Sequence, residues 1–395
     1  MIDLQTRAKF TQEQIGEMNK VKIIRLIKNN KEVTKSELST KLGLSHTTVN
    51  TYVQKLIDEG LVERAGVAAS NGGRKPMIVK LVAEAKYSFG VSITPKAVYI
   101  LLVNLLGDKV VSTYFSYRKG DELEKVLNKL KYWIEQIICV NGLDRNKIMG
   151  MGMVFPGVVD DDECVLKYSP NLNVRNYDFK RFEENIGLKI YVENEANAAA
   201  YAEQLLGKGR DKGNFVYVSI GDGIGTGIII DKHIYKGNQK KAGEFGHLKI
   251  SEEKIKCNCG RTGCWELFAS KMALLRYFEE YTQQKIYLIE QVFMAYQQGD
   301  TGASQALEKY AHYLFRGLEN ILLSVNPDYV IIGGDLGQYA QQIIEIAVEK
   351  LHFTDRFFGY ENTKIYCSGL HAEGAVIGAA LLPLEAIFNY QKNVI

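Results

Sequence analysis

A weak internal repeat divides most of this chain into two similar halves. Residues 89–110 are FGVSITPKAVYILLVNLLGDKV, and residues 216–237 are VYVSIGDGIGTGIIIDKHIYKG. Each segment predicts a strand, a turn, a second strand, a polar turn and a third strand. Two copies of one α/β unit predict two lobes, and the cleft between two lobes is a favoured position for a ligand.

The expected elements follow the same order in both halves. In the first half, three strands precede a helix near 123–140. In the second half, the glycine-rich loop 221–227 lies between two strands and opens no helix, so it is not a dinucleotide-binding fingerprint. The loop is equally compatible with a tight hairpin and with a phosphate site. The expected strands are 87–93, 97–103, 109–117, 215–220, 227–230 and 232–235.

The composition of the 395-residue chain is that of an ordinary globular protein, with 46% hydrophobic and 24% charged residues. Six cysteines are too few for a disulfide scaffold. The longest apolar run has about ten residues, whereas a membrane-spanning helix needs about 20. The first residues are polar and lack the apolar core of a signal peptide. We therefore expect a soluble cytoplasmic protein with no membrane partner.

The charge is unevenly distributed along the chain. Residues 1–82 contain 14 Lys and Arg and 8 Asp and Glu, a net charge of +6, whereas the remaining residues carry a net charge of −3. A basic first fifth on a mildly acidic body suggests an arm that binds a polyanion. From charge alone, a solvated helical face is an equally good explanation.

The basic segment has the pattern of a helix-turn-helix. Residues 18–27 (MNKVKIIRLI) place apolar residues on one broad face, which predicts a helix. A second helix is expected over 35–42, because Thr34 and Glu37 have the spacing of a capping box and Gly43 can end the helix. Two helices joined through a Gly-containing turn match this DNA-binding motif.

A third helix, expected over 46–59, carries the side chains that would contact DNA. Its apolar stripe consists of Val49, Val53, Leu56 and Ile57. Its other face has small or uncharged side chains, which are unusual on a solvated surface and suit phosphates and base edges in a major groove. The DNA contacts expected here are Ser45, the N-cap, followed by His46, Thr47, Thr48, Asn50, Thr51 and Gln54.

Two strands, expected over 60–64 and 77–82, would form a wing after the third helix. Between them, glycines flank a basic pair in the sequence NGGRKP. Such a segment can insert Arg74 and Lys75 into an A·T-rich minor groove. A flexible basic turn is the alternative for this segment. A helical bundle that contacts protein is the alternative for the whole region 15–82.

Three cysteines and one histidine have the spacing of a metal site. Cys257, Cys259 and Cys264 lie within eight positions, and nine residues separate His247 from Cys257. These soft and borderline ligands suit a tetrahedral Zn²⁺ ion. Four protein ligands leave no open position, so we expect one structural zinc ion per chain. Disulfides are the weaker explanation in a reducing compartment.

Three segments in the second half resemble the ROK family of repressors, open reading frames and kinases. They are GDGIGTGIII at 221–230, GEFGHLKI at 243–250 and CNCGRTGCWE at 257–266. The resemblance extends over about 300 residues, from residue 87 to the C-terminus. It is strongest to the xylose-operon repressors of Gram-positive bacteria. It implies an α/β, actin-like (ribonuclease-H-like) fold of two lobes, a sugar in the cleft and subunits paired as dimers.

This resemblance implies a division of the chain into three units. Residues 1–82 would form a winged helix-turn-helix domain with a basic wing and linker. Residues 83–195 would form the first lobe, completed by a C-terminal helix at about 375–395. Residues 196–374 would form the second lobe with the zinc site.

The resemblance also implies which side chains bind the sugar. Carboxylates accept hydrogen bonds from hydroxyls, and asparagine both accepts and donates them. His247 would bind zinc through one ring nitrogen and face the sugar with the other. For Glu244 and Glu266 the alternative is a pair of exposed loop carboxylates. For Asn171 and Asn194 the alternative is a turn or cap residue. The implied sugar ligands are Asn171, Asn194, Glu195, Glu244, His247 and Glu266.

Two departures from the kinases of this family argue against sugar phosphorylation. The kinases carry Asp-x-Gly-Gly-Thr on the first strand turn, where this chain has Ser92 for the Asp and Thr94-Pro95 for the glycines. Without the aspartate, the turn lacks a negative charge that could bind a metal ion, and Pro95 lacks the N–H group that a glycine would offer. The side chains of Thr94 and Pro95 would also crowd a phosphate. The kinases' general base is an aspartate, whereas Glu195 places its carboxylate roughly 1 Å away, which can cost about 100-fold in rate.

We therefore expect a transcriptional repressor, not an enzyme, that controls a carbohydrate operon, with xylose utilisation as the first candidate. A dimer, or alternatively a tetramer, would bind a palindromic operator through the third helix of each subunit. A sugar in the cleft (xylose first, then glucose or another aldose) would release the operator DNA. The alternatives are a ROK sugar kinase and a ROK repressor controlled by a protein partner.

Overall fold

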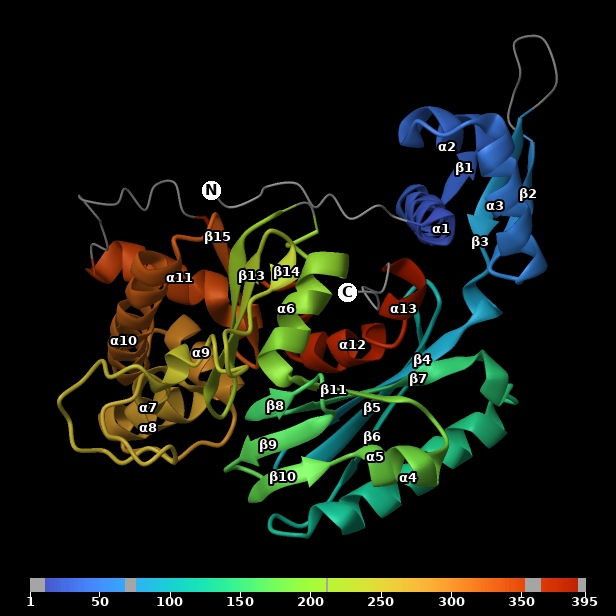
Figure 1. Cartoon of the computed structure of the whole chain (residues 1–395). Coiled ribbons are helices and arrows are strands. Elements are labelled where there is room, and N and C mark those ends of the chain that lie inside the picture. The colour runs from blue at the N-terminus through green and yellow to red at the C-terminus, as the bar shows by residue number, and fades with distance from the viewer. Residues whose placement is uncertain (1–10, 68–75, 211, 352–363, 390–395) are drawn as a thin grey trace, which may run out of the picture.

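The computed structural model describes residues 11–67, 76–210, 212–351 and 364–389. Figure 1 shows a small N-terminal unit standing on one end of a larger body that contains two five-stranded sheets. Within the described residues, every helix is too short or too polar to span a membrane.

Side-chain caps set where the helices of the N-terminal unit begin. Thr34 caps α2 by accepting from Glu37 N at 3.2 Å, and Glu37 Oε2 accepts from Thr34 N at 2.8 Å. The predicted capping box is therefore confirmed, as is Ser45 as the N-cap of the third helix. The first helix is longer than predicted, because a second capping box at Thr11 starts it earlier. The three helices are α1 (Gln12–Asn30), α2 (Lys35–Leu42) and α3 (His46–Asp58).

A three-stranded antiparallel sheet completes the N-terminal unit. Strands β2 (Val62–Val67) and β3 (Met77–Leu81) pair as the predicted wing. Strand β1 (Glu32–Thr34) adds to β3 and was not predicted, because three residues are too few to show an alternating pattern. Arg74 and Lys75 lie outside the described residues.

The two sheets of the body have the same topology, which confirms the duplication (Figure 1). In each sheet, the first three strands form an antiparallel meander, and the fourth and fifth strands add in parallel on the other side of the first strand. The first sheet consists of β4 (Tyr87–Ile93), β5 (Ala97–Asn104), β6 (Lys109–Ser116), β7 (Ile148–Phe155) and β11 (Ile190–Asn194). The second consists of β12 (Phe215–Ile220), β13 (Ile224–Ile230), β14 (His233–Ile234), β15 (Tyr329–Gly334) and β16 (Lys364–Cys367).

The glycine-rich loop is shorter than expected. Strand β13 begins at Ile224, so only three residues, Gly221 to Gly223, connect it to β12. Gly225 and Gly227 lie within the strand. A Cβ atom on Gly227 would lie 2.6 Å from the backbone oxygen of Ala196, so this glycine serves helix packing.

Each sheet is covered by helices on its outer side, and each lobe has its own apolar core. The first lobe also carries a small three-stranded antiparallel sheet. Its elements are α4 (Leu123–Val140), β8 (Val158–Asp160), β9 (Val165–Ser169), β10 (Val174–Asp178) and α5 (Lys180–Ile186). The second lobe has α7 (Glu266–Ala269), α8 (Lys271–Thr282), α9 (Ile289–Gln297), α10 (Thr301–Val325) and α11 (Ala340–Leu351).

Two helices cross between the lobes (Figure 1). Helix α6 (Glu195–Leu206) follows the last strand of the first sheet but packs against β12 and β13 of the second. Helix α12 (Gly374–Leu381) follows the second sheet but packs against β4 and β7 of the first. The two helices also contact each other. The C-terminal segment, expected as one helix, forms α12 and the short α13 (Glu385–Phe388), separated by a turn.

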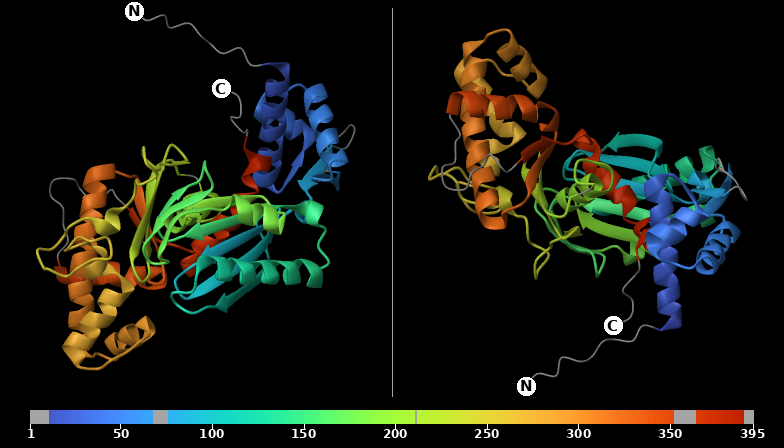
Figure 2. Two further views of the ribbon diagram at one scale, coloured as in Figure 1. Left: turned by 60° about the horizontal axis from the view of Figure 1, so that its bottom comes forward. Right: turned by 90° about the horizontal axis from the view of Figure 1, so that it is seen from above.

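A third apolar core joins the N-terminal unit to the body. Ile24 and Ile27 of α1 belong to the same buried cluster as Ala202 of α6 and Leu381 of α12. Lys28 Nζ lies 4.0 Å from the ring centroid of Phe388 in α13. Figure 2 shows the resulting placement of the N-terminal unit beside the first lobe. The N-terminal unit therefore shares an apolar core with the helices that cross between the lobes.

We expect Gly378→Ala to destabilise the protein. A Cβ atom at this position would lie 1.9 Å from the backbone oxygen of Ala198, where α12 crosses α6. Overpacking costs about 1–3 kcal/mol and outweighs the gain in helix propensity of about 1 kcal/mol. Urea unfolding should show a net loss in the free energy of unfolding. Gly213→Ala is the matched control, because nothing lies within 4 Å of its Cβ position. Equal stability of the two variants would contradict the tight crossing.

Candidate functional site

The exposed face of α3 is a candidate DNA-binding surface. Its apolar residues Val49, Val53 and Leu56 are buried against the N-terminal unit. Ser45 accepts from Thr48 N at 3.1 Å, so Thr48 is half-buried in the cap. The other residues predicted to contact DNA are exposed on this helix: His46, Thr47, Asn50, Thr51 and Gln54.

The predicted metal ligands are brought together in the second lobe. The side-chain donor atoms of His247, Cys257, Cys259 and Cys264 all lie within 4.8 Å of one another. Cys259 Sγ and Cys264 Sγ are 3.6 Å apart, and Cys257 Sγ is 3.6 Å from His247 Nδ1. Donors on a tetrahedral ion with metal–sulfur bonds of about 2.3 Å are about 3.8 Å apart. The four residues therefore fit a tetrahedral metal such as zinc.

Two carboxylates lie beside this cluster. Glu266 Oε1 is 2.9 Å from Cys257 Sγ and 3.5 Å from His247 Nδ1. Glu244 Oε2 is 3.8 Å from His247 Nε2, the ring nitrogen that points away from Cys257. Burial raises the pKa of Glu244, while the nearby His247 acts in the opposite direction. Three of the six implied sugar ligands thus form one group.

The short glycine loop lies between this group and the first turn of α6. A Cβ atom on Gly223 would lie 2.8 Å from Glu266 Oε2, and one on Gly225 would lie 3.0 Å from Ala196 Cβ. Burial, together with the negative charges of Asp335 and Asp222, raises the pKa of Glu195 to about 7. A carboxyl group with this pKa can accept or donate a hydrogen bond near neutral pH.

Of the other implied sugar ligands, Asn194 has a structural role and Asn171 lines a cavity in the first lobe. Asn194 is the N-cap of α6: its Oδ1 accepts from the backbone N–H groups of Ala196 and Asn197 at 2.8 and 3.2 Å. Its Nδ2 donates to Gly157 O at 2.9 Å, so its amide group retains one hydrogen for a ligand. Asn171 lines a cavity of about 170 Å³ in the first lobe, together with Pro95, Tyr117 and Leu123.

A group of ion pairs lies at the short glycine loop. Lys271 lies between Asp222, at 2.9 Å, and Asp335. Lys96, from the turn between β4 and β5, lies 3.9 Å from Asp222 and so connects the two lobes. The two lysines offset the charges of the two aspartates, so the ammonium group of Lys271 is already engaged by carboxylates.

The family model described as ROK matches residues 111–386. The chain belongs to the ROK family. A model for a winged helix-turn-helix DNA-binding domain matches residues 19–63 of this ROK protein. The xylose repressor of Bacillus subtilis strain 168 is 33% identical over 319 residues, which cover 80% of this chain and 82% of the relative. A putative xylose repressor of Caldicellulosiruptor sp. is 29% identical over 399 residues, covering 96% and 98%.

Solved structures of other ROK proteins share the fold. The crystal structure of a ROK transcriptional regulator, a homologue of the E. coli MLC protein, has a TM-score of 0.80 at 24% identity and covers 95% of this chain and 97% of that one. A ROK glucokinase from Streptomyces griseus, in complex with glucose and AMPPNP, has a TM-score of 0.66 at 23% identity, covering 75% and 98%. These similarities confirm the predicted two-lobed ROK fold.

The winged helix-turn-helix domain and the similarity to xylose repressors identify this ROK protein as a non-enzymatic regulator. Ser92, which the resemblance places where the kinases carry an aspartate, is buried in β4. Thr94 closes a tight turn, with its hydroxyl 3.0 Å from Ala97 O. Neither side chain supplies the carboxylate that the kinases carry at this turn.

Several site residues were not identified from the sequence. Asp222 and Asp335 each follow a strand end and one or two glycines, and β12 and β15 are parallel neighbours. Because parallel strands end at the same sheet edge, this pattern could have predicted their proximity. No comparable signal was available for the lysines, because they lie in no recognisable motif. They are Lys271, which pairs with Asp222, and Lys236 and Lys240, which pair with carboxylates of the first lobe.

We expect the freshly purified protein to contain one zinc ion per chain. Cys259→Ser should bring the zinc content well below one and lower the melting temperature by several degrees, because a structural metal contributes directly to folding. Elemental analysis and thermal unfolding measure both effects. Cys139→Ser, an exposed cysteine outside the cluster, is the control. Absence of zinc from wild-type protein that has not met a chelator would refute the site.

The raised pKa of Glu195 predicts a pH-dependent effect of Glu195→Gln on stability. Protonated Glu195 stabilises the fold below its ordinary pKa of 4.5, and this contribution is lost as the pH rises through about 7. The wild type should therefore match the variant near pH 5 and be less stable at pH 8. The expected difference is on the order of 1–3 kcal/mol, reduced by solvent screening. Urea unfolding at both pH values tests this, and a pH-independent difference would contradict the pKa shift.

Proposed function

We propose that this ROK protein is a sugar-responsive transcriptional repressor that binds a palindromic operator as a dimer. In this proposal α3 lies in the major groove, and the segment with Arg74 and Lys75 contacts the neighbouring minor groove. The sugar binds in the cleft between the lobes and releases the DNA. The role of the protein on operator DNA places it in the cytoplasm.

The observation that carries this proposal is the position of α6. Its first residue, Glu195, lies near Asp222 of the glycine loop and near Asp335, whose charges act on its carboxyl group, and Gly223 of the same loop borders Glu266 of the candidate sugar group. Toward its other end, Ala202 lies in the core shared with the DNA-binding unit. A change in the position of α6 on sugar binding would therefore act directly on the packing of that unit.

The cleft offers a polar set suited to sugar hydroxyls. Glu195 and Glu244 can accept hydrogen bonds, and Asn194 retains one amide hydrogen. We assign the metal site to a structural zinc ion, held by His247 and the three cysteines. This ion would stabilise the segment that carries Glu244 and Glu266. Xylose is the first candidate ligand, because the names of two similar relatives specify xylose.

Release of DNA requires different sugar affinities in the two forms of the protein. A sugar that bound both forms equally would shift nothing. The sugar must therefore bind the DNA-free form more tightly. By linkage, operator DNA must then weaken sugar binding by the same factor.

A panel of sugars tests the proposal. We expect xylose at about 10 mM to raise the melting temperature of the zinc-loaded protein by a few degrees and to weaken binding to the operator. A ligand at 100 times its dissociation constant adds about 2.7 kcal/mol to the stability. Glucose, other aldoses and amino sugars complete the panel. A shift with another sugar would support the same mechanism and assign the protein to a different operon. The absence of any shift would refute a free sugar as the ligand and favour a protein partner.

Arg74→Ala provides the matched variant for this test. It should weaken binding to the operator, because it removes a cationic contact with the minor groove, and leave the affinity for sugar unchanged. Filter binding or fluorescence anisotropy measures the first effect, and calorimetry the second. A change in the sugar affinity alone would contradict the assignment.

A further inference from the structure

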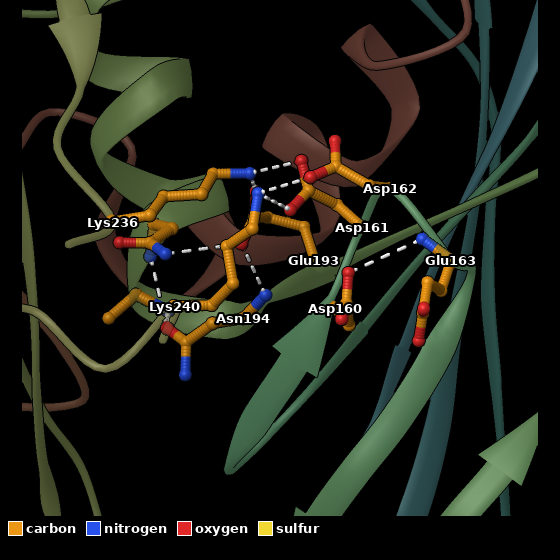
Figure 3. Close-up of polar contacts among 10 residues, drawn as sticks. Asp160, Asp161, Asp162, Glu163, Glu193, Asn194, Lys236 and Lys240 are labelled. Carbon is orange, nitrogen blue, oxygen red and sulfur yellow. Dashed lines mark hydrogen bonds and ion pairs between the residues drawn. The ribbon is translucent and has the colours of Figure 1, made fainter. Parts of the chain in front are cut away.

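A network of ion pairs joins the two lobes beside the candidate sugar ligands (Figure 3). Lys236 Nζ lies 2.6 Å from Asp161 Oδ2 and also pairs with Glu193. Lys240 Nζ lies 2.8 Å from Asp162 Oδ2 and 3.0 Å from Asp161 Oδ1. Both lysines belong to the loop after β14 of the second lobe. All three carboxylates belong to the first lobe.

The network has a buried inner part and an exposed outer part. The side chain of Glu193 is 5% exposed and that of Lys236 is 18% exposed, whereas that of Asp162 is 77% exposed. Burial acts to raise the pKa of Asp161, but the ammonium of Lys236 keeps it below its ordinary value. The carboxyl group of Asp161 is therefore ionised at neutral pH. An ion pair as deeply buried as the inner one is costly to break. The half-buried pair of Lys240 with Asp161 contributes less, and the exposed Asp162 adds little by itself.

The inner pair also contacts the first turn of α6. Glu193 Oε1 accepts from Asn194 N at 2.7 Å and from Asn197 Nδ2 at 3.1 Å. The same carboxylate group receives Lys236 on its other oxygen. Opening the lobes would pull Lys236 away from Glu193 and leave a buried carboxylate without its cation. Closure and the position of the α6 turn are therefore linked through Glu193.

We propose that Lys236 and Lys240 form a latch that holds the two lobes closed and positions the first turn of α6. The latch sets the fraction of molecules in the closed form. The effect of the latch on ligand binding rests on the proposed sugar-binding function. The effect of the latch on the distance between the lobes is independent of that function.

The first experiment measures the distance between the lobes without sugar or DNA. Spin labels on noncanonical amino acids replace Tyr132 in α4 and Tyr287 before α9, both of which are exposed. Labelled full-length protein is diluted with unlabelled protein, and pulsed electron resonance gives the intramolecular distance. We expect Lys236→Met combined with Lys240→Met to lengthen this distance. An unchanged distance in the folded double variant would overturn the latch.

Lys167→Met is the matched control. Lys167 pairs with Asp160 at 3.3 Å and with Glu163, so it contacts the same acidic turn from within the first lobe. Its removal changes the charge of the turn but breaks no contact between the lobes. We therefore expect no change in the distance. An increase as large as that of the double variant would assign the effect to charge alone and refute the latch.

A milder variant covers the case in which the double variant fails to fold. Lys240→Met combined with Asp162→Asn removes only the exposed outer part and leaves Lys236 paired with Glu193. A smaller shift in the same direction would support the latch, and an unchanged distance distribution would overturn it.

Sugar binding then separates the latch from the proposed function. If the closed fraction of the double variant falls to about one tenth, its apparent affinity for the sugar falls about tenfold. Calorimetry with the sugar that stabilises the wild type measures this ratio. If the wild type binds no sugar, the proposed function fails while the distance still tests the latch. A lengthened distance with unchanged sugar affinity would refute control of binding by the latch.

Discussion

The structure depends on the close backbone contact between two crossing helices and the sheets beneath them. Helices α6 and α12 each leave one lobe and pack on the sheet of the other. Glycines at Gly152, Gly227 and Gly378 allow backbone atoms to approach where any Cβ atom would collide. Such contacts are short, so the two helices are held tightly on the sheets. Both the placement of the two lobes and the support of the N-terminal unit follow from this arrangement.

Much of the fold could be predicted from the sequence, because repeated local patterns specify it. The capping box of Thr34 and Glu37, the strands at 87–93 and 215–220 and the helix at 123–140 all have strong local signals. The duplicated strand order confirms the repeat. The predicted extent of the glycine loop was wrong, because Gly225 and Gly227 lie in a strand where α6 approaches closely, and not in a turn. A contact between distant segments leaves little trace in local spacing.

The candidate site likewise contains some residues that local sequence patterns predict and others that they do not. The metal cluster depends on short spacing within one loop, and its side chains come together as expected. The ion pairs of Lys236, Lys240 and Lys271 join residues that lie 43 to 79 positions apart in the sequence. Single lysines in loops and at the first position of a helix are common, so nothing local distinguishes these three. Asn194 is an intermediate case: its place before α6 predicts a cap, and the structure shows that capping uses most of its hydrogen bonds.

The carboxylates of Asp222 and Asp335 also bear on how such a regulator keeps its signal. A receptor that phosphorylated its ligand would consume the molecule whose concentration it reports. In this chain Ser92 and Pro95 depart from the kinase pattern, and Lys271 is paired with Asp222 and Asp335. Under the proposed function, a bound sugar therefore leaves the site unaltered, and binding reports the sugar concentration without depleting the sugar.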